Sequence, residues 1–192
     1  WYIHPPLWFW MTSAFCETFG WTEFNLRLPE AIFGIVGLIA VYLIASLYYT
    51  RKTALFSSLI LGTSMTYFVI SRLAIFDTML NAFILFAIYF FLKAYKNPDK
   101  KGIYFFFLAI SCFLGVLTKG PIGLVHPCAV IVIFLLFKKD IKFLLDKRVI
   151  LNFFIFFFFT SPWYIHQLII NGKPLFDKAL QDYTLYRFFC TV

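Results

Sequence analysis

Six ionisable side chains lie beside long apolar runs, where a charge is expensive. They are His4, Arg72, Asp77, Lys119, His166 and Arg187. A charged group at the centre of a bilayer costs about 2.5–3.5 kcal/mol on insertion scales. Ionisable residues at membrane depth are therefore functional candidates. Basic side chains there can hold an anionic group through charge-assisted hydrogen bonds, and a carboxylate can shape the site around it.

Each candidate also has a structural interpretation, and the residue types alone leave both open. Arg72 and Asp77 are five residues apart and do not share a helix face, so they could form an interfacial ion pair that ends two helices. Arg72 could instead reach the lipid headgroups. Lys119 could be a topology anchor. Glu30 begins an apolar run beside Pro29, where a helix N-terminus favours a carboxylate, so we expect a structural role.

The cysteines and histidines do not indicate a metal site. Cys16, Cys112, Cys128 and Cys190 form no CxxC pair, and we expect buried structural thiols. The histidines lack metal-ligand spacing. His126 lies inside an apolar run, where we expect it to hydrogen-bond a neighbouring helix. We predict no metal and no cofactor.

The composition excludes a soluble or disordered chain. Of 192 residues, 62% are hydrophobic and 14% charged, with mean hydropathy +0.84. Soluble domains are about 45–50% apolar and about 25% charged, and a chain of this length cannot bury so much apolar surface. We predict an all-α integral membrane protein, a polytopic helical bundle. The net charge of +8 lies in short clusters between apolar runs, which argues against nucleic-acid binding.

Six apolar runs could cross the hydrocarbon core. They cover residues 28–50, 53–70, 78–94, 103–117, 122–137 and 149–166. The stretch 53–94 is too long for one span and should break between Arg72 and Asp77. A second break should fall at Lys119, Gly120 and Pro121, with Pro121 in the first turn of the next helix.

The charges predict which loops face the cytoplasm. Eleven Lys and Arg fall in the loops after the first, third and fifth spans, against Asp99, Asp140 and Asp146. On the other side six basic and six acidic residues balance. The positive-inside rule places the first group in the cytoplasm and the six candidate residues outside.

The remaining segments complete the predicted organisation. Residues 1–27 form an outer segment in which 5–19 lie as an aromatic-rich interfacial helix, 28–166 hold the six spans, and 167–192 begin an outer loop. The chain starts at Trp1 rather than Met. We interpret it as part of a single larger membrane domain, with an N-terminal span, its first outer loop and a C-terminal part missing.

The order of several short motifs resembles one family. They are His4-Pro5-Pro6-Leu7-Trp8, Arg27-Leu28-Pro29, Ser71-Arg72-Leu73-Ala74-Ile75-Phe76-Asp77 and Leu117-Thr118-Lys119-Gly120-Pro121, with a weaker Ser161-Pro162-Trp163-Tyr164 and Tyr186-Arg187-Phe188. Together they resemble membrane glycosyltransferases of the C-type fold, the superfamily of protein O-mannosyltransferases and bacterial 4-amino-4-deoxy-L-arabinose lipid A transferases.

The resemblance implies a function and a location. Such enzymes move a sugar from a polyprenyl-phosphate carrier to a lipid A, glycan or protein acceptor, with inversion, on the outer face of a bacterial inner membrane. The expected partners are membrane lipids, the donor and the acceptor. The general base, a carboxylate of the first outer loop, should lie upstream of Trp1, so this fragment alone should be inactive.

The resemblance also assigns roles residue by residue. Lys119 and Arg187 match phosphate-contacting residues, and His4, at the first place of a Lys/His-Pro-Pro motif whose lysine binds phosphate in relatives, is a third candidate for the donor phosphate. Asp77 matches an aspartate that shapes the active site, while Arg72 and His166 are further possible members. Relatives often carry an acidic, His or Asn residue shortly before the arginine matched by Arg187, where this chain has Tyr183 and Thr184.

Two other functions remain open at this stage. A transporter or flippase of an anionic lipid-linked substrate could use the same basic groups without breaking a bond. It should show a broken-helix site near the midplane, often with repeats. A structural or assembly protein is the other alternative, although it has no need to gather His4, Asp77, Lys119 and Arg187 on one face.

Overall fold

The computed structural model describes residues 5–172, and these residues are helical with no strand among them. The α-helices are α1 (Leu7–Phe19), α2 (Glu23–Ser46), α3 (Arg51–Thr63), α4 (Met65–Ile70), α5 (Asp77–Lys96), α6 (Lys101–Lys119), α7 (Ile122–Lys138) and α8 (Lys147–Asn171). Two short 3-10 turns, η1 (Pro98–Lys100) and η2 (Ile141–Leu145), lie in the loops. The all-α prediction is confirmed.

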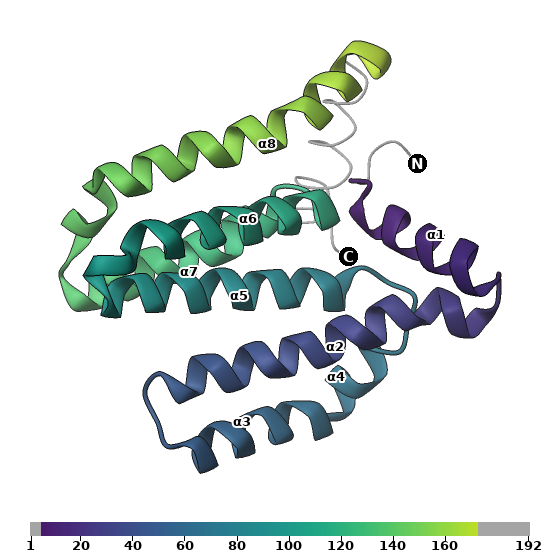
Figure 1. Ribbon diagram of the computed structural model, residues 1–192, viewed down its shortest axis with the longest axis horizontal. Helices are drawn as coiled ribbons and strands as arrows, with labels where there is room; N and C mark the ends of the chain where they lie inside the picture. The colour runs from purple at the N-terminus through teal and green to yellow at the C-terminus, as the bar shows by residue number, and fades with distance from the viewer. Residues whose placement is uncertain (1–4, 173–192) are drawn as a thin grey trace, which may run out of the picture.

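The long helices run back and forth between two ends of a bundle (Figure 1). Helices α2 and α5 run in the same direction, because α3 and α4 return the chain between them, and from α5 to α8 the direction alternates; α1 crosses the end at which α2 and α5 begin and α6 stops. The interfacial helix predicted over 5–19 therefore exists as α1, and it packs on α2 and α6. Its depth in a bilayer stays a prediction.

Four helical segments are long and apolar enough to cross a membrane. They are Glu23–Ser46, Asp77–Lys96, Pro98–Lys119 and Lys147–Ile170. A fifth apolar helix, Ile122–Lys138, is shorter. The chain is thus a multi-pass membrane protein, and each of the six predicted runs corresponds to helical structure. Whether all six cross the bilayer stays a prediction.

The second predicted run is not one helix. It divides into α3 and α4 at Ser64, whose backbone is extended (φ −65°, ψ 130°). The Ser64 hydroxyl donates a hydrogen bond to the Leu61 carbonyl at 2.8 Å, which offers the backbone an alternative to the helical ladder. Gly62 and Thr63 precede it and have low helix propensity, so the continuous span expected over 53–70 is wrong in this detail.

The predicted breaks at charged residues are confirmed. Helix α4 ends at Ile70 and α5 begins at Asp77, so both Arg72 and Asp77 lie at or outside helix ends. Helix α6 ends at Lys119 and α7 begins directly after Pro121. In each case the charge lies at the edge of an apolar helix rather than within it.

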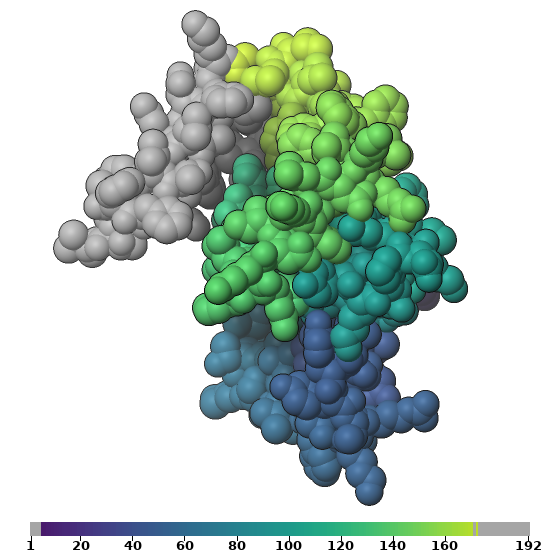
Figure 2. Space-filling model, turned by 90° about the vertical axis from the view of Figure 1, so that its left-hand side faces the viewer, coloured from purple at the N-terminus to yellow at the C-terminus, as the bar shows by residue number. Residues whose placement is uncertain are grey.

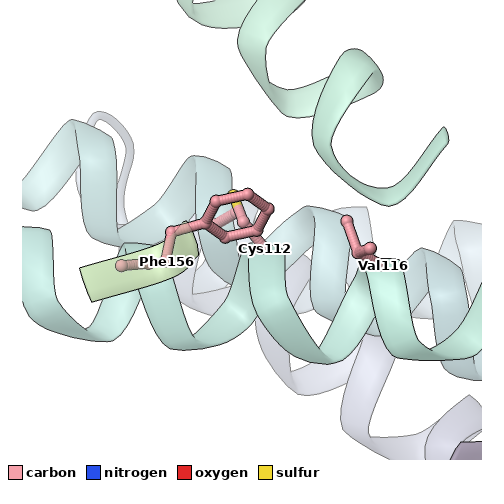
Figure 3. Packing of buried hydrophobic residues seen from close by; sticks show 5 residues of the cluster. Cys112, Val116 and Phe156 are labelled. Carbon is pink, nitrogen blue, oxygen red and sulfur yellow. The ribbon is translucent and has the colours of Figure 1, made fainter. Parts of the chain in front are cut away.

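Two apolar clusters hold the central helices together. One joins Ala87 of α5, Ala109, Cys112 and Val116 of α6, and Phe156 of α8. Figure 3 shows the Phe156 ring lying against Cys112. The other joins α5 to α7 through Phe91, Leu92, Ile131 and Leu135. Helix α5 contributes to both clusters and is therefore the central helix of the fold.

Helices α6 and α7 form a hairpin whose backbones touch. A Cβ atom on Gly123 would lie 2.2 Å from the carbonyl carbon of Gly115, and one on Gly115 would lie 3.3 Å from the Gly123 Cα. Real Cβ atoms do not approach backbone to 2.2 Å, so Gly123 needs a residue without a side chain, while a side chain at Gly115 would make a tight contact. This crossing lies four residues before Lys119 and fixes the end of α6.

The corner between α1 and α2 is closed by one amide side chain. The Nδ2 of Asn25 donates hydrogen bonds to the carbonyls of Phe19 (2.9 Å) and Gly20 (2.8 Å), while the Thr22 side chain accepts from the Asn25 backbone amide. These bonds satisfy carbonyls left free at the end of α1 and a free amide at the start of α2.

The opposite end of the bundle collects the basic loops. Figure 2 looks onto this end, where the loops after α2 (blue), α5 (teal) and α7 (green) meet the viewer. All eleven Lys and Arg that the positive-inside rule assigns to the cytoplasm lie in or beside these loops. The two sets of charges therefore lie at opposite ends, as the sequence predicts.

One ion pair ties two of these loops together. Lys101 at the start of α6 donates to the Asp146 carboxylate at 2.6 Å, and its ammonium lies 3.7 Å from the Phe143 ring centroid. Asp146 also caps α8 by accepting from the Arg148 amide at 2.9 Å. The Lys101 hydrogen bond, followed by the Arg148 amide, lowers the pKa of the Asp146 carboxyl from its ordinary value.

We expect Gly123→Ala to prevent correct assembly of the α6–α7 hairpin. The new methyl group would meet backbone atoms of Gly115 and Val116, which cannot turn aside as a side chain can. Overpacking of this kind costs at least about 1–3 kcal/mol. Thermal unfolding of the detergent-solubilised full-length protein should show a lower midpoint or no folded protein.

Gly102→Ala is the matched control, because its Cβ would meet only the Arg148 Cδ at an ordinary 3.8 Å. This variant should unfold at or slightly above the parent temperature. Equal stability of the two alanine variants would contradict the close crossing of α6 and α7.

We expect Asp146→Asn to destabilise the protein by about 0.2–1 kcal/mol, the usual value of a solvent-accessible ion pair. Asparagine keeps the helix cap but removes the negative charge beside Lys101. Because the folded-state pKa of Asp146 is lowered, its stabilisation is present above about pH 4 and is lost as the pH falls below that value. The difference in unfolding midpoint should therefore shrink in acid. Asp99→Asn, on an exposed turn, should unfold like the parent at every pH.

Candidate functional site

Asp77 and Lys119 form an ion pair at the end of the bundle opposite the basic loops. The Lys119 Nζ donates a hydrogen bond to the Asp77 Oδ1, joining residues 42 positions apart. The Lys119 side chain is 28% exposed and the Asp77 side chain 42%, so the pair is partly open to its surroundings. A further molecule could therefore reach the ammonium without unfolding the bundle.

Helix direction explains why these two residues meet. Asp77 is the first residue of α5 and Lys119 is the last residue of α6. The two helices are adjacent and antiparallel, so the start of one lies beside the end of the other (Figure 1). A carboxylate is favoured at a helix N-terminus and an ammonium at a C-terminus, so each charge also suits its helix dipole.

Gly120 brings three of the sequence motifs to one place. Its backbone adopts φ +81° and ψ −154°, a region open essentially to glycine alone. A Cβ built on it would lie 3.8 Å from the Tyr164 hydroxyl and 4.0 Å from the Pro5 Cγ. The Lys-Gly-Pro turn therefore lies beside the motif that begins at His4 and the motif that contains Tyr164.

An aromatic ring lies beside the ammonium. The Lys119 Nζ lies 5.0 Å from the Phe76 ring centroid, within the range of a cation–π interaction. The Phe76 ring packs edge-on against Trp8 of α1 with centroids 6.3 Å apart. The two rings form an apolar wall on one side of the ion pair.

A cavity of about 280 Å³ adjoins the carboxylate side of the pair. It is lined by Leu61, Ser64, Thr66, Tyr67, Ile70, Asp77, Thr78 and Asn81. The lining combines apolar surface with polar groups from the α3–α4 segment and from the start of α5. The helix break at Ser64 helps to form this cavity, because Ser64, the last turn of α3 and residues of α4 all line it.

The other predicted site residues have different outcomes. Arg72 is exposed and stacks its guanidinium over Phe68 at 3.8 Å, with no ion pair to Asp77 among the described contacts. His166 is exposed on α8. His4 and Arg187 lie outside the described residues. The predicted grouping is thus observed for Asp77 and Lys119, and the roles of all six residues stay predictions.

Arg27, part of a quoted motif, pairs with Glu23 on the exposed surface of α2 at 3.5 Å. Two expectations for other residues were wrong. Among the described contacts the hydrogen bond of His126 is to its own helix rather than to a neighbouring one, with its Nδ1 3.1 Å from the Ile122 carbonyl oxygen. Cys16 and Cys112 are buried as expected, but Cys128 is exposed.

Two buried polar groups near the site were not identified as candidates. Glu30 is fully buried two turns into α2, and neither carboxylate oxygen has a hydrogen-bond partner among residues 5–172. The Tyr164 hydroxyl is likewise buried without one. For Glu30 a signal existed, since it is an acidic residue at the edge of an apolar run. Within the described residues no group of three metal-ligating side chains gathers.

Comparison with known proteins supports a common fold. The chain resembles the crystal structure of ArnT from Cupriavidus metallidurans bound to undecaprenyl phosphate, with a TM-score of 0.85, 22% sequence identity and coverage of 97% of this chain and 35% of that one. Such a likeness shows that the two share a fold.

Sequence relatives point the same way. An uncharacterised protein of Aquifex aeolicus is 30% identical over 96% of this chain, and a second is 28% identical over 93%. The undecaprenyl phosphate-alpha-4-amino-4-deoxy-L-arabinose arabinosyl transferase of Aeromonas salmonicida is 27% identical over 75%. The chain spans 40%, 35% and 27% of the length of these three relatives respectively.

A family model assigns most of the chain. The model for dolichyl-phosphate-mannose-protein mannosyltransferase matches residues 3–166, which include every helix from α1 to α7 and most of α8. This match covers the Asp77–Lys119 pair and the turn at Gly120. The chain therefore belongs to the dolichyl-phosphate-mannose-protein mannosyltransferase family.

Proposed function

We propose that this chain is the donor-phosphate-binding part of a glycosyltransferase that moves a sugar from a polyprenyl-phosphate carrier. The observation that carries the proposal is the Lys119 ammonium, held at one end of an apolar bundle and partly exposed. A phosphate carried by a membrane lipid reaches the protein at this depth. Family membership and the named activity of the Aeromonas relative favour the same chemistry.

The reaction requires a group that stabilises a leaving phosphate. The acceptor oxygen attacks the anomeric carbon, and the bond from that carbon to the phosphate oxygen breaks with its electron pair on the phosphate. The phosphate thereby changes from a diester monoanion to a monoester with one more negative charge. A positioned ammonium such as Lys119 interacts more strongly with that product-like charge than with the donor.

Asp77 holds the ammonium in place before the donor arrives. Its carboxylate accepts from Lys119, so the lysine does not turn away into the headgroups. When the phosphate binds, it supplies further acceptors on the exposed side of the ammonium. We propose that His4 and Arg187 contribute at the same phosphate, and that the proton of the acceptor hydroxyl goes to a carboxylate outside this chain.

The orientation of the charges supports a location for this chemistry. The eleven basic residues at the other end favour that end as cytoplasmic. The Asp77–Lys119 pair then faces the periplasm of a bacterial inner membrane, where a lipid A, glycan or protein acceptor would be modified. No metal or further cofactor enters the proposed chemistry.

We expect Lys119→Ala in the full-length protein to lower the rate of sugar transfer about 10²–10³-fold, the usual cost of removing one oxyanion-stabilising group. The assay follows radiolabelled sugar from a synthetic polyprenyl-phosphate donor and measures the polyprenyl phosphate released. Lys142→Ala, on the exposed turn at the opposite end, is the matched control and should retain parental turnover. A Lys119→Ala enzyme with normal turnover would remove the phosphate assignment. Movement of intact donor across vesicles without released phosphate would instead indicate a transporter.

We expect the effects of Asp77→Asn and Lys119→Ala to be strongly non-additive. If Asp77 acts by holding the ammonium, its loss costs little once the ammonium is absent. Asp77→Asn alone should lower turnover about tenfold, and the double variant should match Lys119→Ala. Additive losses would show that Asp77 has a separate role.

A further inference from the structure

The carboxyl group of Glu30 lies inside the junction of three helices. Its side chain is 0% exposed, and neither oxygen has a hydrogen-bond partner among the described residues. The groups beside it are the Met79 backbone amide, the Thr78 hydroxyl and the Trp8 indole. Thr78 directly follows Asp77 in the first turn of α5, and Trp8 belongs to the first turn of α1.

The N-terminus of its own helix does not explain this residue. Helix α2 begins at Glu23, so Glu30 lies two turns inside it, whereas the dipole acts within the first turn. Burial of a carboxyl without hydrogen bonds costs free energy, and an apolar side chain of similar length would avoid that cost. A buried polar group of this kind needs another explanation.

The surrounding donors match the carboxyl group. The Trp8 Nε1 and the Thr78 Oγ1 are also buried without a hydrogen-bond partner among residues 5–172. One is a donor only and the other can donate, while a carboxyl group offers two acceptor oxygens. Small side-chain rotations would therefore close hydrogen bonds from α1 and from α5 onto the same residue of α2.

We propose that Glu30 is a positioning residue, and its effect on catalysis rests on the proposed function. Glu30 binds the Trp8 indole and the Thr78 hydroxyl, and it thereby holds α1 against the start of α5. The Trp8 ring packs on Phe76, which lies beside the Lys119 ammonium. Glu30 therefore fixes the wall of the site and the residue next to Asp77 without touching the donor. Helix α1 also begins within the motif that starts at His4.

Glu30→Met in the full-length protein separates this role from simple packing. Methionine fills a similar volume and removes the unsatisfied oxygens, so a packing role predicts equal or higher stability with parental turnover. We expect the unfolding midpoint to be unchanged or raised, while kcat falls at least about tenfold through misplacement of the site. Glu30→Gln, which retains one acceptor oxygen, should recover most of the lost kcat.

A second readout does not depend on sugar transfer. Amide hydrogen exchange should speed up in Leu7–Phe19 and in the first turn of α5 in Glu30→Met, but not in Glu30→Gln. Thr160→Val is the control, because Thr160 is a buried threonine of α8 whose hydroxyl also lacks a described partner. It should change neither exchange in α1 nor turnover. If the parent protein transfers no sugar, the proposed function fails while the exchange measurement still tests Glu30.

Parental exchange and parental turnover in Glu30→Met would overturn the inference. If Glu30→Met does not fold, Thr78→Val tests the proposed role of Glu30 in its place. This nearly isosteric change removes one of the two proposed hydrogen bonds, and we expect faster exchange in α1 and a severalfold lower kcat. Parental behaviour of Thr78→Val in that case would also overturn it.

Discussion

The dominant constraint on this chain is the cost of placing charge in an apolar bundle. Asp77 and Lys119 belong to two central helices, and neither charge could lie midway along its helix without a large penalty. The fold resolves this by ending α6 at the lysine and starting α5 at the aspartate, so both charges meet at one end. The pair remains partly exposed, and this leaves it free to bind an anion.

Much of this arrangement follows from the order of residues. Composition alone excludes a soluble protein, and the charged interruptions at Asp77 and Lys119 mark helix ends correctly because charge and hydrocarbon are incompatible. The basic loops also predict correctly which helix ends lie together. The sequence could not predict that Asp77 and Lys119 touch, because two residues at the same end of a bundle need not be neighbours. The antiparallel packing of α5 on α6 brings them together.

Other features depend on competition that a hydropathy pattern does not record. The division of α3 from α4 comes from a serine that bonds its own backbone within an otherwise apolar run. The position of Glu30 within its helix was predicted wrongly because α2 begins five residues earlier than the hydrophobic run suggests, at Glu23 with Thr22 as its cap. Burial is also uneven. In the most apolar part of α5 half of the residues are buried, whereas in the most apolar part of α8 only 11% are. Helix α8 therefore needs lipid or other protein along most of its surface.

The contact between Gly115 and Gly123 has a mechanical consequence for the lysine that follows it. Where two backbones meet directly, no layer of side chains can rearrange between them, so this part of the hairpin resists sliding and rotation. Lys119 extends from the rigid section by a single helical turn. Its charge is consequently preorganised: folding has already ordered the backbone that carries the ammonium, and an arriving anion need not supply that free energy.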